Sequence, residues 1–359
     1  MSKKAAVLTV HRANNFGAVL QAYALQNFLN KNGFKVDIIN YLCPFIENLY
    51  GYFPLRKGNA LKNIIKSLLL IPVVFLRRRN FDGFRLKFLK TTAPVTRAEL
   101  KNLNGSYDMF ITGSDQVFNG RLTNYDTSYF LDFVDSRAKK ASYAASFGLT
   151  ELTKQEEALY TPLLTDFDNL LLREKEGQDL LKKLTGKEAP TVLDPVFLLT
   201  KEEWADIAIM PKEKNYILVY VMEKEKSIMD FAKQLSQKTG LKIIYLFFNP
   251  LHGVKDKSVI AAPQEYLGYF MAADYIVTNS FHGAAFAIKF NKRFFVGMLR
   301  SLGSLNSRLN HLLKTAKLES RIIDENSLNN TGNVDFSAAN AAIAEQTQKS
   351  ARLITDILK

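Results

Sequence analysis

The amino-acid sequence predicts an α/β protein made of two consecutive halves. Short runs of β-branched and other apolar residues alternate with longer segments of helical periodicity, which is the pattern of parallel sheets covered by helices. The alternation restarts near residue 190, and 359 residues exceed the roughly 250–300 at which a single core stops growing. We therefore expect one domain over residues 1–188, a second over residues 189–335, and a C-terminal helix over residues 336–359.

The first half begins with a strand that is followed by a helix. The apolar run at residues 7–10 predicts the strand, and Leu20, Leu25 and Phe28 give the next segment its helical pattern. Similar apolar runs predict the other strands of this half, at residues 35–41, 109–112, 141–146 and 170–172. A short strand at residues 190–195 marks the junction with the second half.

The second half repeats the alternation three times. Its strands are expected at residues 216–222, 242–247 and 275–278, and its helices at residues 227–239, 264–272 and 283–290. The tail predicts a final helix from apolar positions such as Ile343, Ile354 and Leu358, and this helix can cross back to the first domain. Ligands of such sheets bind beyond the carboxyl ends of the strands, so the candidate site is expected there.

Composition limits the class of protein. The single cysteine, Cys43, excludes an internal disulfide and a cysteine-based metal cluster, and the four histidines are too scattered for metal-ligand spacing. The longest apolar run, residues 64–76, contains Lys66 and Pro72 and is shorter than the roughly 20 residues that cross a bilayer. The first residues contain too few apolar side chains for a secretory signal. We therefore expect a cytoplasmic protein.

The net charge of +13 is concentrated in one segment. Residues 56–101, the basic segment, hold twelve Lys and Arg side chains against Asp82 and Glu99, within an insertion expected at about residues 50–100 of the first domain. One interpretation is an amphipathic surface that contacts anionic lipid on the inner face of the cytoplasmic membrane. The other is a solvated helix face whose aliphatic residues pack inward. Nucleic acid is a weaker interpretation, because no recognition helix, zinc finger or RNP-type motif accompanies the charge.

In the first half, polar residues follow the strands predicted at residues 7–10 and 109–112. Asn15 and Gly17 open a helix whose N–H groups and dipole favour an anion, although an ordinary N-cap with a turn glycine has the same sequence. Ser114 and Asp115 follow the strand at residues 109–112. Asp115 is either a catalytic base or the cap of the next turn.

Two later strand ends carry a cation and a titratable group. Arg173 follows three leucines, and its guanidinium suits a ligand carboxylate or phosphate, or else Asp194 or another acid of the protein. Ser280 and His282 lie where the strand at residues 275–278 gives way to a helix. The helix dipole disfavours a charged imidazole and a bound anion favours it, so a ligand can set the protonation of His282. A purely structural histidine is the alternative.

Several sequence blocks together resemble one known family. In chain order they are NNFGAVLQAYALQNFL, ITGSDQVFN, YAASFG, LLREKEG, VLDPVFLL and VTNSFHGAAFAIKFNKRFF. This order resembles that of the polysaccharide pyruvyl transferase family over residues 14–297, without explaining the basic segment. The resemblance implies a GT-B-like fold, with two Rossmann-like domains facing a central cleft. It also implies phosphoenolpyruvate as donor, a lipid-linked or polymeric saccharide as acceptor, a cyclic pyruvate ketal as product, and no metal or nucleotide cofactor.

The resemblance also implies which strand-end residues form the site, and we infer their proton-transfer roles from their chemistry. Arg173 and His282 are expected to bind the donor, and His282 to supply a proton to its methylene group or to the leaving phosphate. Asp115 is expected to take the proton of the acceptor hydroxyl. The other expected substrate-binding residues are Asn15, Gly17, Ser114 and Ser280.

Two other functions fit parts of the sequence. A GT-B glycosyltransferase that uses a nucleotide sugar would share the fold, but no clear acidic residue for a ribose follows Phe290. A catalytically silent protein that binds membrane or nucleic acid would explain the basic segment. The intact SFHG and REKEG blocks favour an enzyme over that alternative.

Overall fold

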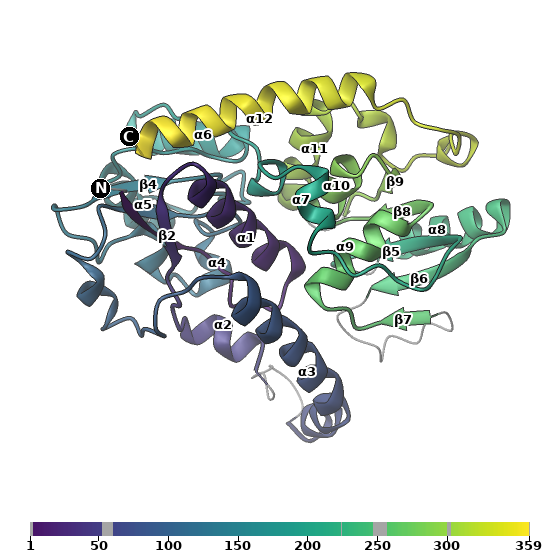
Figure 1. Cartoon of the computed structure of the whole chain (residues 1–359), viewed down its shortest axis with the longest axis horizontal. Coiled ribbons are helices and arrows are strands. Elements are labelled where there is room, and N and C mark those ends of the chain that lie inside the picture. The colour runs from purple at the N-terminus through teal and green to yellow at the C-terminus, as the bar shows by residue number, and fades with distance from the viewer. Residues whose placement is uncertain (1–2, 52–59, 224, 247–256, 300–302, 359) are drawn as a thin grey trace. The chain divides into compact units, whose positions relative to one another are not determined.

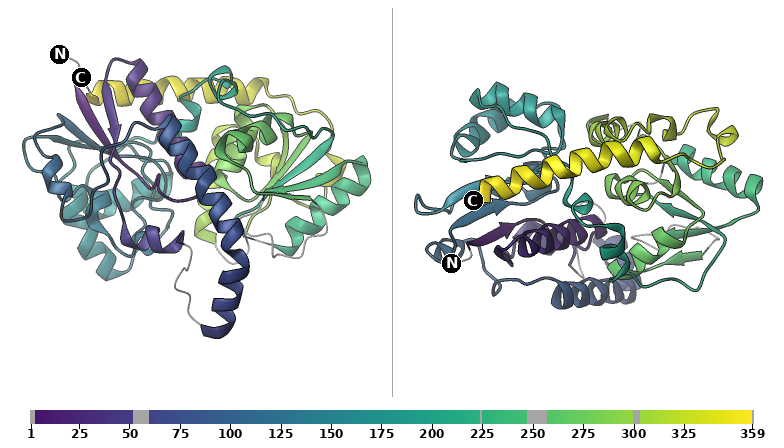
Figure 2. Two further views of the ribbon diagram at one scale, coloured as in Figure 1. Left: turned by 60° about the horizontal axis from the view of Figure 1, so that its bottom comes forward. Right: turned by 45° about the horizontal axis from the view of Figure 1, so that its top comes forward.

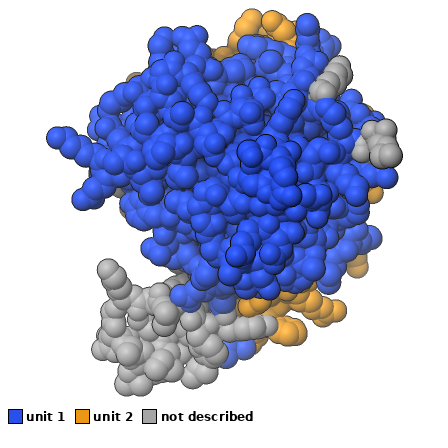
Figure 3. All heavy atoms as spheres, turned by 90° about the vertical axis from the view of Figure 1, so that its left-hand side faces the viewer, with its two compact units in different colours: residues 1–71, 85–198, 346–359 blue, residues 72–84, 199–345 orange. Residues whose placement is uncertain are grey.

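The computed structural model describes residues 3–51, 60–223, 225–246, 257–299 and 303–358. The chain divides into two compact units, which Figure 3 colours separately. The first unit consists of residues 1–71, 85–198 and 346–359, and the second of residues 72–84 and 199–345. Compared with the expected ranges, the first unit continues to Leu198 and includes the end of the C-terminal helix, and the second includes a piece of the basic segment.

The first unit is built on a parallel sheet of four strands in the order β2-β1-β3-β4 (Figure 1). The strands are β1 Lys4–Leu8, β2 Lys35–Ile38, β3 Met109–Thr112 and β4 Lys139–Ser142, and each overlaps an expected strand. The strands expected at residues 170–172 and 190–195 are wrong, because only isolated bridges form there, at Leu172 and Thr191. The Ser142 hydroxyl accepts the N–H of Leu171 and donates to its carbonyl, so a side chain replaces part of the ladder.

Both faces of this sheet are apolar, as expected for a parallel sheet covered by helices. Because side chains alternate along a strand, β1 sends Ala6 and Leu8 into one core and Ala5 and Val7 into the other. The helices of the unit are α1 Phe16–Lys31, α2 Pro44–Leu49, α4 Gly120–Thr123, α5 Lys154–Thr165 and α6 Lys175–Thr185. Its 3-10 turns are η1 Leu100–Leu103, η2 Thr127–Phe130 and η3 Pro195–Phe197.

The last helix, α12 Ser337–Leu358, ends on the first sheet. Ile354 and Leu358 are 0% and 1% exposed and share a core with Val7 and Val36. Ser350, on the same helix, accepts the N–H of Leu193 through its hydroxyl at 2.9 Å. Both views of Figure 2 show the C-terminal end of α12 beside the N-terminal strand. The expected return of this helix to the first domain is therefore confirmed.

The second unit contains a parallel sheet of five strands in the order β7-β6-β5-β8-β9. The strands are β5 Tyr216–Tyr220, β6 Lys242–Leu246, β7 Lys257–Val259, β8 Tyr275–Thr278 and β9 Arg293–Val296. The helices and turns are α7 Lys201–Ala205, α8 Lys226–Thr239, α9 Pro263–Ala272, α10 Phe281–Lys289, α11 Gly303–Thr315, η5 Glu319–Arg321 and η6 Ser327–Asn329. The three expected strands are confirmed, and β7 and β9 add edges that the sequence pattern did not predict. With two parallel sheets in two units, the α/β class is also confirmed.

Apolar residues cover both faces of the second sheet. Ile217 and Val219 of β5 pack with Phe231 of α8 on one face. Elsewhere in the unit the core is aromatic: the ring centroids of Trp204 and Phe286 lie 5.2 Å apart, edge to face.

The basic segment forms most of a long helix, α3 Ala60–Phe88. Phe81 and Phe84 of this helix are buried, but Phe75, Leu76 and Leu86 are exposed, Leu86 to 87%. The helix therefore buries some of its apolar side chains and exposes others. No helix in the described part of the chain is both long and apolar enough to span a membrane.

Several cations of the basic segment have partners within the described residues, among them Arg85, Lys90 and Arg97. Arg85 donates to the carbonyls of His11 and Arg12 and to Asn14 Oδ1. In addition, ion pairs join Lys90 to Asp37 and Arg97 to Asp132. Two others, Arg56 and Lys57, lie outside the described residues. The charge available to a partner is therefore smaller than the sequence alone suggests.

Replacing Ile354 with alanine should destabilise the first unit by about 2–5 kcal/mol, because a fully buried side chain would leave a cavity. Urea denaturation followed by circular dichroism should show the loss. Trp204, the single tryptophan, belongs to the second unit, so its fluorescence should shift less. The control is Lys349→Ala on an exposed position of α12. Equal effects of the two substitutions would contradict the packing of α12.

Candidate functional site

Polar residues of the first unit gather where its parallel strands end. Asp115 follows β3 and forms a bridge with Ala145, which follows β4. Ala145 forms a further bridge with Leu172, so Arg173 comes next to the same strand ends. Thus Asp115 and Arg173, far apart in the sequence, are brought together as expected at one edge of the sheet.

Arg173 makes an ion pair with a buried carboxylate. Its Nη1 lies 2.8 Å from Asp194 Oδ2, and its Nη2 lies 3.6 Å from Asp115 Oδ1. The Ser114 hydroxyl also donates to Asp194 Oδ2, at 2.9 Å. The side chains of Arg173 and Asp194 are 2% and 0% exposed, whereas that of Asp115 is 16% exposed. Of these three side chains, Asp115 is the most exposed. The sequence analysis left two kinds of partner open for Arg173, a ligand or an acid of the protein, and the structure shows its contact with Asp194.

The charges around Arg173 are unequal in number. Burial lowers the pKa of the guanidinium, but the carboxylates of Asp194, Asp115 and Glu174 together raise it above its usual value. One cation therefore faces three carboxylates. The guanidinium thus lies among carboxylates, with Nη1 hydrogen-bonded to Asp194 Oδ2 and Nη2 at 3.6 Å from Asp115 Oδ1.

Glu174 is a buried residue of this edge that sequence reasoning missed. Its Oε1 accepts three hydrogen bonds, from the Ser146 hydroxyl at 2.8 Å, from the Phe147 N–H at 3.0 Å and from the Gly148 N–H at 3.2 Å. These bonds fix the loop after β4. The signal was present in the LLREKEG block, where an acid follows Arg173 directly, but its partners lie 26 to 28 positions away.

The loops at this edge contain unusual backbone conformations. Asp115 has φ of 83° and Ala144 has φ of 52°, in the left-handed region that side chains disfavour. The N–H of Ser146 donates to the carbonyl of Asp115 at 2.9 Å and ties the two loops together. Gly148 has φ of 59°, and a Cβ there would lie 1.9 Å from Gln116 Oε1. Asp115 is therefore held in a conformation that only its surroundings can maintain, as is common at functional sites.

The start of α1 lies close to the same edge. Asn15 caps this helix by accepting the N–H of Ala18 at 3.3 Å, which is the ordinary N-cap of the sequence analysis. Gln21 of α1 donates to the Thr9 hydroxyl at 2.8 Å, and that hydroxyl donates to the carbonyl of Ser114 at 2.9 Å. Gly17 is buried in the first turn. The helix start and the end of β3 are thus joined by a chain of hydrogen bonds.

His11 belongs to the frame of this edge. It is buried after β1, and its Nδ1–H donates to the carbonyl of Thr9 at 3.2 Å. Burial, together with the guanidinium groups of Arg85 and Arg12, lowers the pKa of His11 to about 3. The imidazole is therefore neutral near pH 7 and serves as a hydrogen-bond donor.

In the second unit, Ser280 and His282 lie at the start of α10. Ser280 caps the helix by accepting the N–H of Gly283 at 3.3 Å, so the helix begins two residues earlier than expected and includes His282. A Cβ at Gly283 would lie 2.3 Å from Thr278 Oγ1, which donates to the carbonyl of Tyr220 at 2.6 Å. His282 is 6% exposed and lies in the first turn of this closely packed helix.

Neighbouring residues also fix this turn. Asn279 accepts the N–H of Met222 at 2.7 Å and donates to the carbonyl of Glu223 at 2.8 Å, which joins the ends of β5 and β8. Each of these polar groups follows the carboxyl end of a parallel strand. In the described residues, no group of three or more His, Cys, Asp or Glu side chains is arranged to hold a metal ion.

The expected site residues thus form three groups. Ser114, Asp115 and Arg173 share one polar cluster in the first unit. Asn15 and Gly17 lie at the start of α1 in the same unit, and Ser280 and His282 lie in the first turn of α10 in the second. Each unit therefore presents polar side chains at the carboxyl ends of its own strands.

Comparison with solved structures gives distant likenesses over nearly the whole chain. UDP-N-acetylglucosamine 2-epimerase from Rickettsia bellii is 12% identical, with a TM-score of 0.49, over 100% of this chain and 97% of that one. UDP-GlcNAc 2-epimerase from Methanocaldococcus jannaschii is 14% identical, with a TM-score of 0.48, over 99% of both chains. Arabidopsis thaliana UGT89C1, complexed with UDP-L-rhamnose, is 10% identical, with a TM-score of 0.47, over 99% of this chain and 95% of that one. Likenesses at this level carry no conclusion about the reaction.

The family comparison is more specific. Comparison with curated proteins gave no significant match. A family model described as polysaccharide pyruvyl transferase matches residues 15–296, which include the three polar groups at the strand ends. This span covers well over half of the chain, from the cap of α1 to the end of β9. The chain therefore belongs to the polysaccharide pyruvyl transferase family.

Proposed function

We propose that the protein transfers pyruvate from phosphoenolpyruvate to a sugar of a surface polysaccharide or of its lipid-linked precursor. The products are a cyclic pyruvate ketal on that sugar and inorganic phosphate. The observation that carries this proposal is the family match over residues 15–296, within which Asp115 and His282 follow the ends of parallel strands and Arg173 follows a bridge to the loop after β4.

The reaction needs proton transfers but no redox change. Protonation of the methylene carbon of phosphoenolpyruvate makes its C2 electrophilic, and an acceptor hydroxyl then forms a C–O bond to C2. The C2–O bond to phosphate breaks, and a second hydroxyl closes the ring. Two hydroxyl protons are lost from the acceptor, while one proton is gained by the new methyl group and one by the phosphate. The overall reaction is therefore balanced without a further co-reactant.

Two residues suit the two kinds of proton transfer. Asp115 is a partly exposed carboxylate in a fixed position, which suits a base for the acceptor hydroxyl. His282, in a capped helix turn, suits a donor of the proton to the methylene carbon or to the phosphate, with Ser280 beside it. Because its side chain is buried against Asp194, Arg173 acts in this proposal chiefly by positioning Asp115.

The anionic donor needs N–H groups and positive potential. The first turn of α1, with Asn15 and Gly17, offers helix N–H groups at the positive end of a helix of 16 residues. Arg85 adds a guanidinium group close by, because it contacts Asn14 and the carbonyl of His11. This part of the first unit therefore suits the carboxylate or the phosphate of phosphoenolpyruvate.

We also propose that α3 brings the protein to anionic membrane, where a lipid-linked acceptor is found. Phe75, Leu76 and Arg79 are exposed and, at helical spacing, Leu86 and Lys87 continue the same side. Exposed apolar side chains mixed with cations are typical of helices that lie on a lipid surface. This surface supports the docking interpretation over a solvated face.

The proposed transfer is tested by incubating the protein with phosphoenolpyruvate and candidate lipid-linked saccharides. Phosphate release should require both substrates, and NMR should detect the ketal methyl group. His282→Ala should lower kcat by about a hundredfold or more, the range for a positioned acid–base group. His282→Gln keeps a hydrogen-bond donor, so it should recover donor affinity while kcat stays low. Release of nucleotide from a nucleotide sugar, with no use of phosphoenolpyruvate, would refute the function; unstable His282 variants with normal kcat would refute the role of the histidine.

Arg173→Lys should lower activity strongly although it keeps the charge, because an ammonium group cannot hold two carboxylates in the geometry of a guanidinium. Since Arg173 acts through Asp115, the loss should appear mainly in kcat, with a smaller change in the KM for phosphoenolpyruvate. Steady-state kinetics on the folded variant measure both. A rise in KM with unchanged kcat would instead assign Arg173 to direct donor binding, and normal kinetics would remove it from the site.

Changing Arg79 and Lys87 together to glutamine should weaken binding to vesicles that contain anionic lipid by about tenfold or more, since each cation contributes roughly 1 kcal/mol near such a surface. Vesicle sedimentation at physiological salt measures the change. The control, Lys233→Gln with Lys349→Gln, removes the same charge from exposed positions elsewhere. Turnover of a water-soluble acceptor should stay unchanged. Equal vesicle binding by the two double variants would contradict docking through α3.

A further inference from the structure

A polar pocket of about 240 Å³ lies in the second unit, at the end of the sheet opposite to His282. It is formed where β8 and β9 begin, whereas His282 follows the carboxyl end of β8. Its main side chains are Asp274, Asn291, Lys292, Arg293, Asn333 and Phe336. None of them belongs to the strand ends described above, and no step of the proposed reaction uses them.

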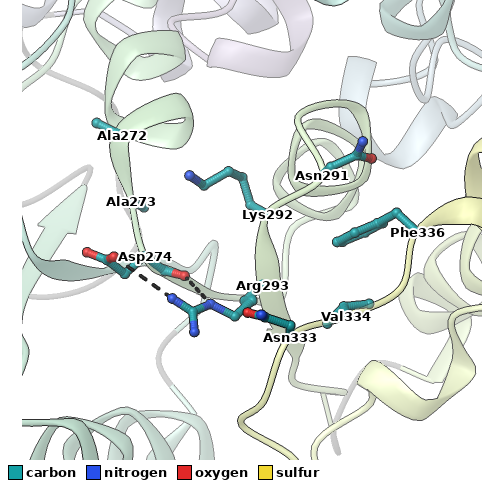
Figure 4. A pocket seen from close by; sticks show the side chains of 9 residues that line it. All are labelled: Ala272, Ala273, Asp274, Asn291, Lys292, Arg293, Asn333, Val334 and Phe336. Carbon is teal, nitrogen blue, oxygen red and sulfur yellow. Dashed lines mark hydrogen bonds and ion pairs between the residues drawn. The ribbon is translucent and has the colours of Figure 1, made fainter.

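One end of this pocket is cationic. Figure 4 shows Lys292 and Arg293, from the start of β9, both extending toward the segment of Ala272, Ala273 and Asp274. Lys292 Nζ donates to the carbonyl of Met271 at 2.9 Å, and Arg293 Nε donates to the carbonyl of Asp274 at 3.2 Å. An ammonium has three N–H donors and a guanidinium has five, more than these contacts use.

The position of the guanidinium is fixed by its neighbours. Arg293 lies over the ring of Tyr275, 4.2 Å from its centroid, and donates to its hydroxyl at 3.1 Å. The hydroxyl of Tyr275 in turn donates to the carbonyl of Thr331 at 2.6 Å. The cationic end is therefore a preformed part of the pocket, held by side chains and backbone.

Positive charge exceeds negative charge at this end. Burial lowers the pKa of Lys292, and repulsion from Lys201 and Arg293 lowers it further, against the attraction of Asp274. Two cations, Lys292 and Arg293, therefore line this end together with one carboxylate, Asp274, whose Oδ1 lies 3.9 Å from Arg293 Nη2. The excess positive charge attracts an anionic group, and a phosphate monoester carries close to two negative charges near pH 7.

The facing wall suits a ring that has both apolar and hydroxyl groups. Phe336 presents its ring and Val334 its methyl groups, and Figure 4 shows both on the side facing Lys292 and Arg293. The amides of Asn291 and Asn333 can donate to and accept from hydroxyls. A sugar ring has C–H groups on its faces and hydroxyls along its edge, which matches this combination.

The volume of the pocket is also sufficient. A cavity of about 150 Å³ holds a six-membered benzene ring in another protein. The additional space in a pocket of about 240 Å³ leaves room for a phosphate group next to a ring. We propose that this pocket binds a sugar monophosphate, with its phosphate on Lys292 and Arg293 and its ring against Phe336.

Glucose 1-phosphate is a suitable probe, and isothermal titration calorimetry on the whole protein measures its binding. It should bind at least tenfold more tightly than inorganic phosphate, and glucose alone should bind more weakly than either. Lys292→Gln should weaken both phosphate-containing ligands about tenfold. Phe336→Ala should weaken glucose 1-phosphate at least fivefold and leave inorganic phosphate unchanged. The matched control, Lys233→Gln, should bind all three ligands like the parent protein.

The two pocket variants separate this site from any phosphate bound at the strand ends, since neither residue lies there. Phe336 is only half-buried, so Phe336→Ala should remain folded, and its melting temperature checks this. No binding of glucose 1-phosphate to the parent protein would overturn the proposal. So would binding that is unchanged in Lys292→Gln or in Phe336→Ala.

Discussion

The buried ion pair between Arg173 and Asp194 is the interaction on which the polar edge of the first unit depends. Removing two charges from water costs several kcal/mol per ion, and this cost is offset only by good geometry and further hydrogen bonds. Here Ser114 donates to the same carboxylate and Asp115 lies 3.6 Å from the same guanidinium. The pair therefore joins three chain segments that are distant in the sequence. Loss of either partner would leave an uncompensated buried charge, at a cost of about 3–5 kcal/mol.

Around this pair, hydrogen bonds between buried groups hold the loops next to Asp115, whose side chain is 16% exposed. Glu174 holds the loop after β4 by three hydrogen bonds, and that loop holds Asp115 in a left-handed conformation. The second unit follows the same design with different residues, because the Ser280 cap and the tight contact at Gly283 fix the turn that carries His282. In both units, a polar side chain at the end of a parallel strand is positioned by buried neighbours.

The sequence could predict the alternation of strands and helices because apolar runs and helical periodicity are local. It could also name Asp115, Arg173 and His282, since polar residues that follow apolar runs stand out. The isolated bridge at Leu172 could not be foreseen, because the Ser142 hydroxyl that replaces the ladder comes from another strand. Glu174 was missed because its hydrogen-bond partners lie 26 or more positions away in the sequence. The pocket at Lys292 was missed because its residues come from several separate loops.

The first unit is built from three separate stretches of the chain, and this has a consequence for its biosynthesis. Its sheet forms from early parts of the chain, but one face of that sheet is covered by residues 346–358, which the ribosome adds only after the whole of residues 199–345. Pairings between such distant segments are slow, because the loop between them must close first. The second unit can therefore assemble while this core of the first unit still lacks Ile354 and Leu358, a state in which nascent chains aggregate or recruit chaperones. The position of Ile354 and Leu358 thus makes completion of the first unit depend on residues that are synthesised after the second unit.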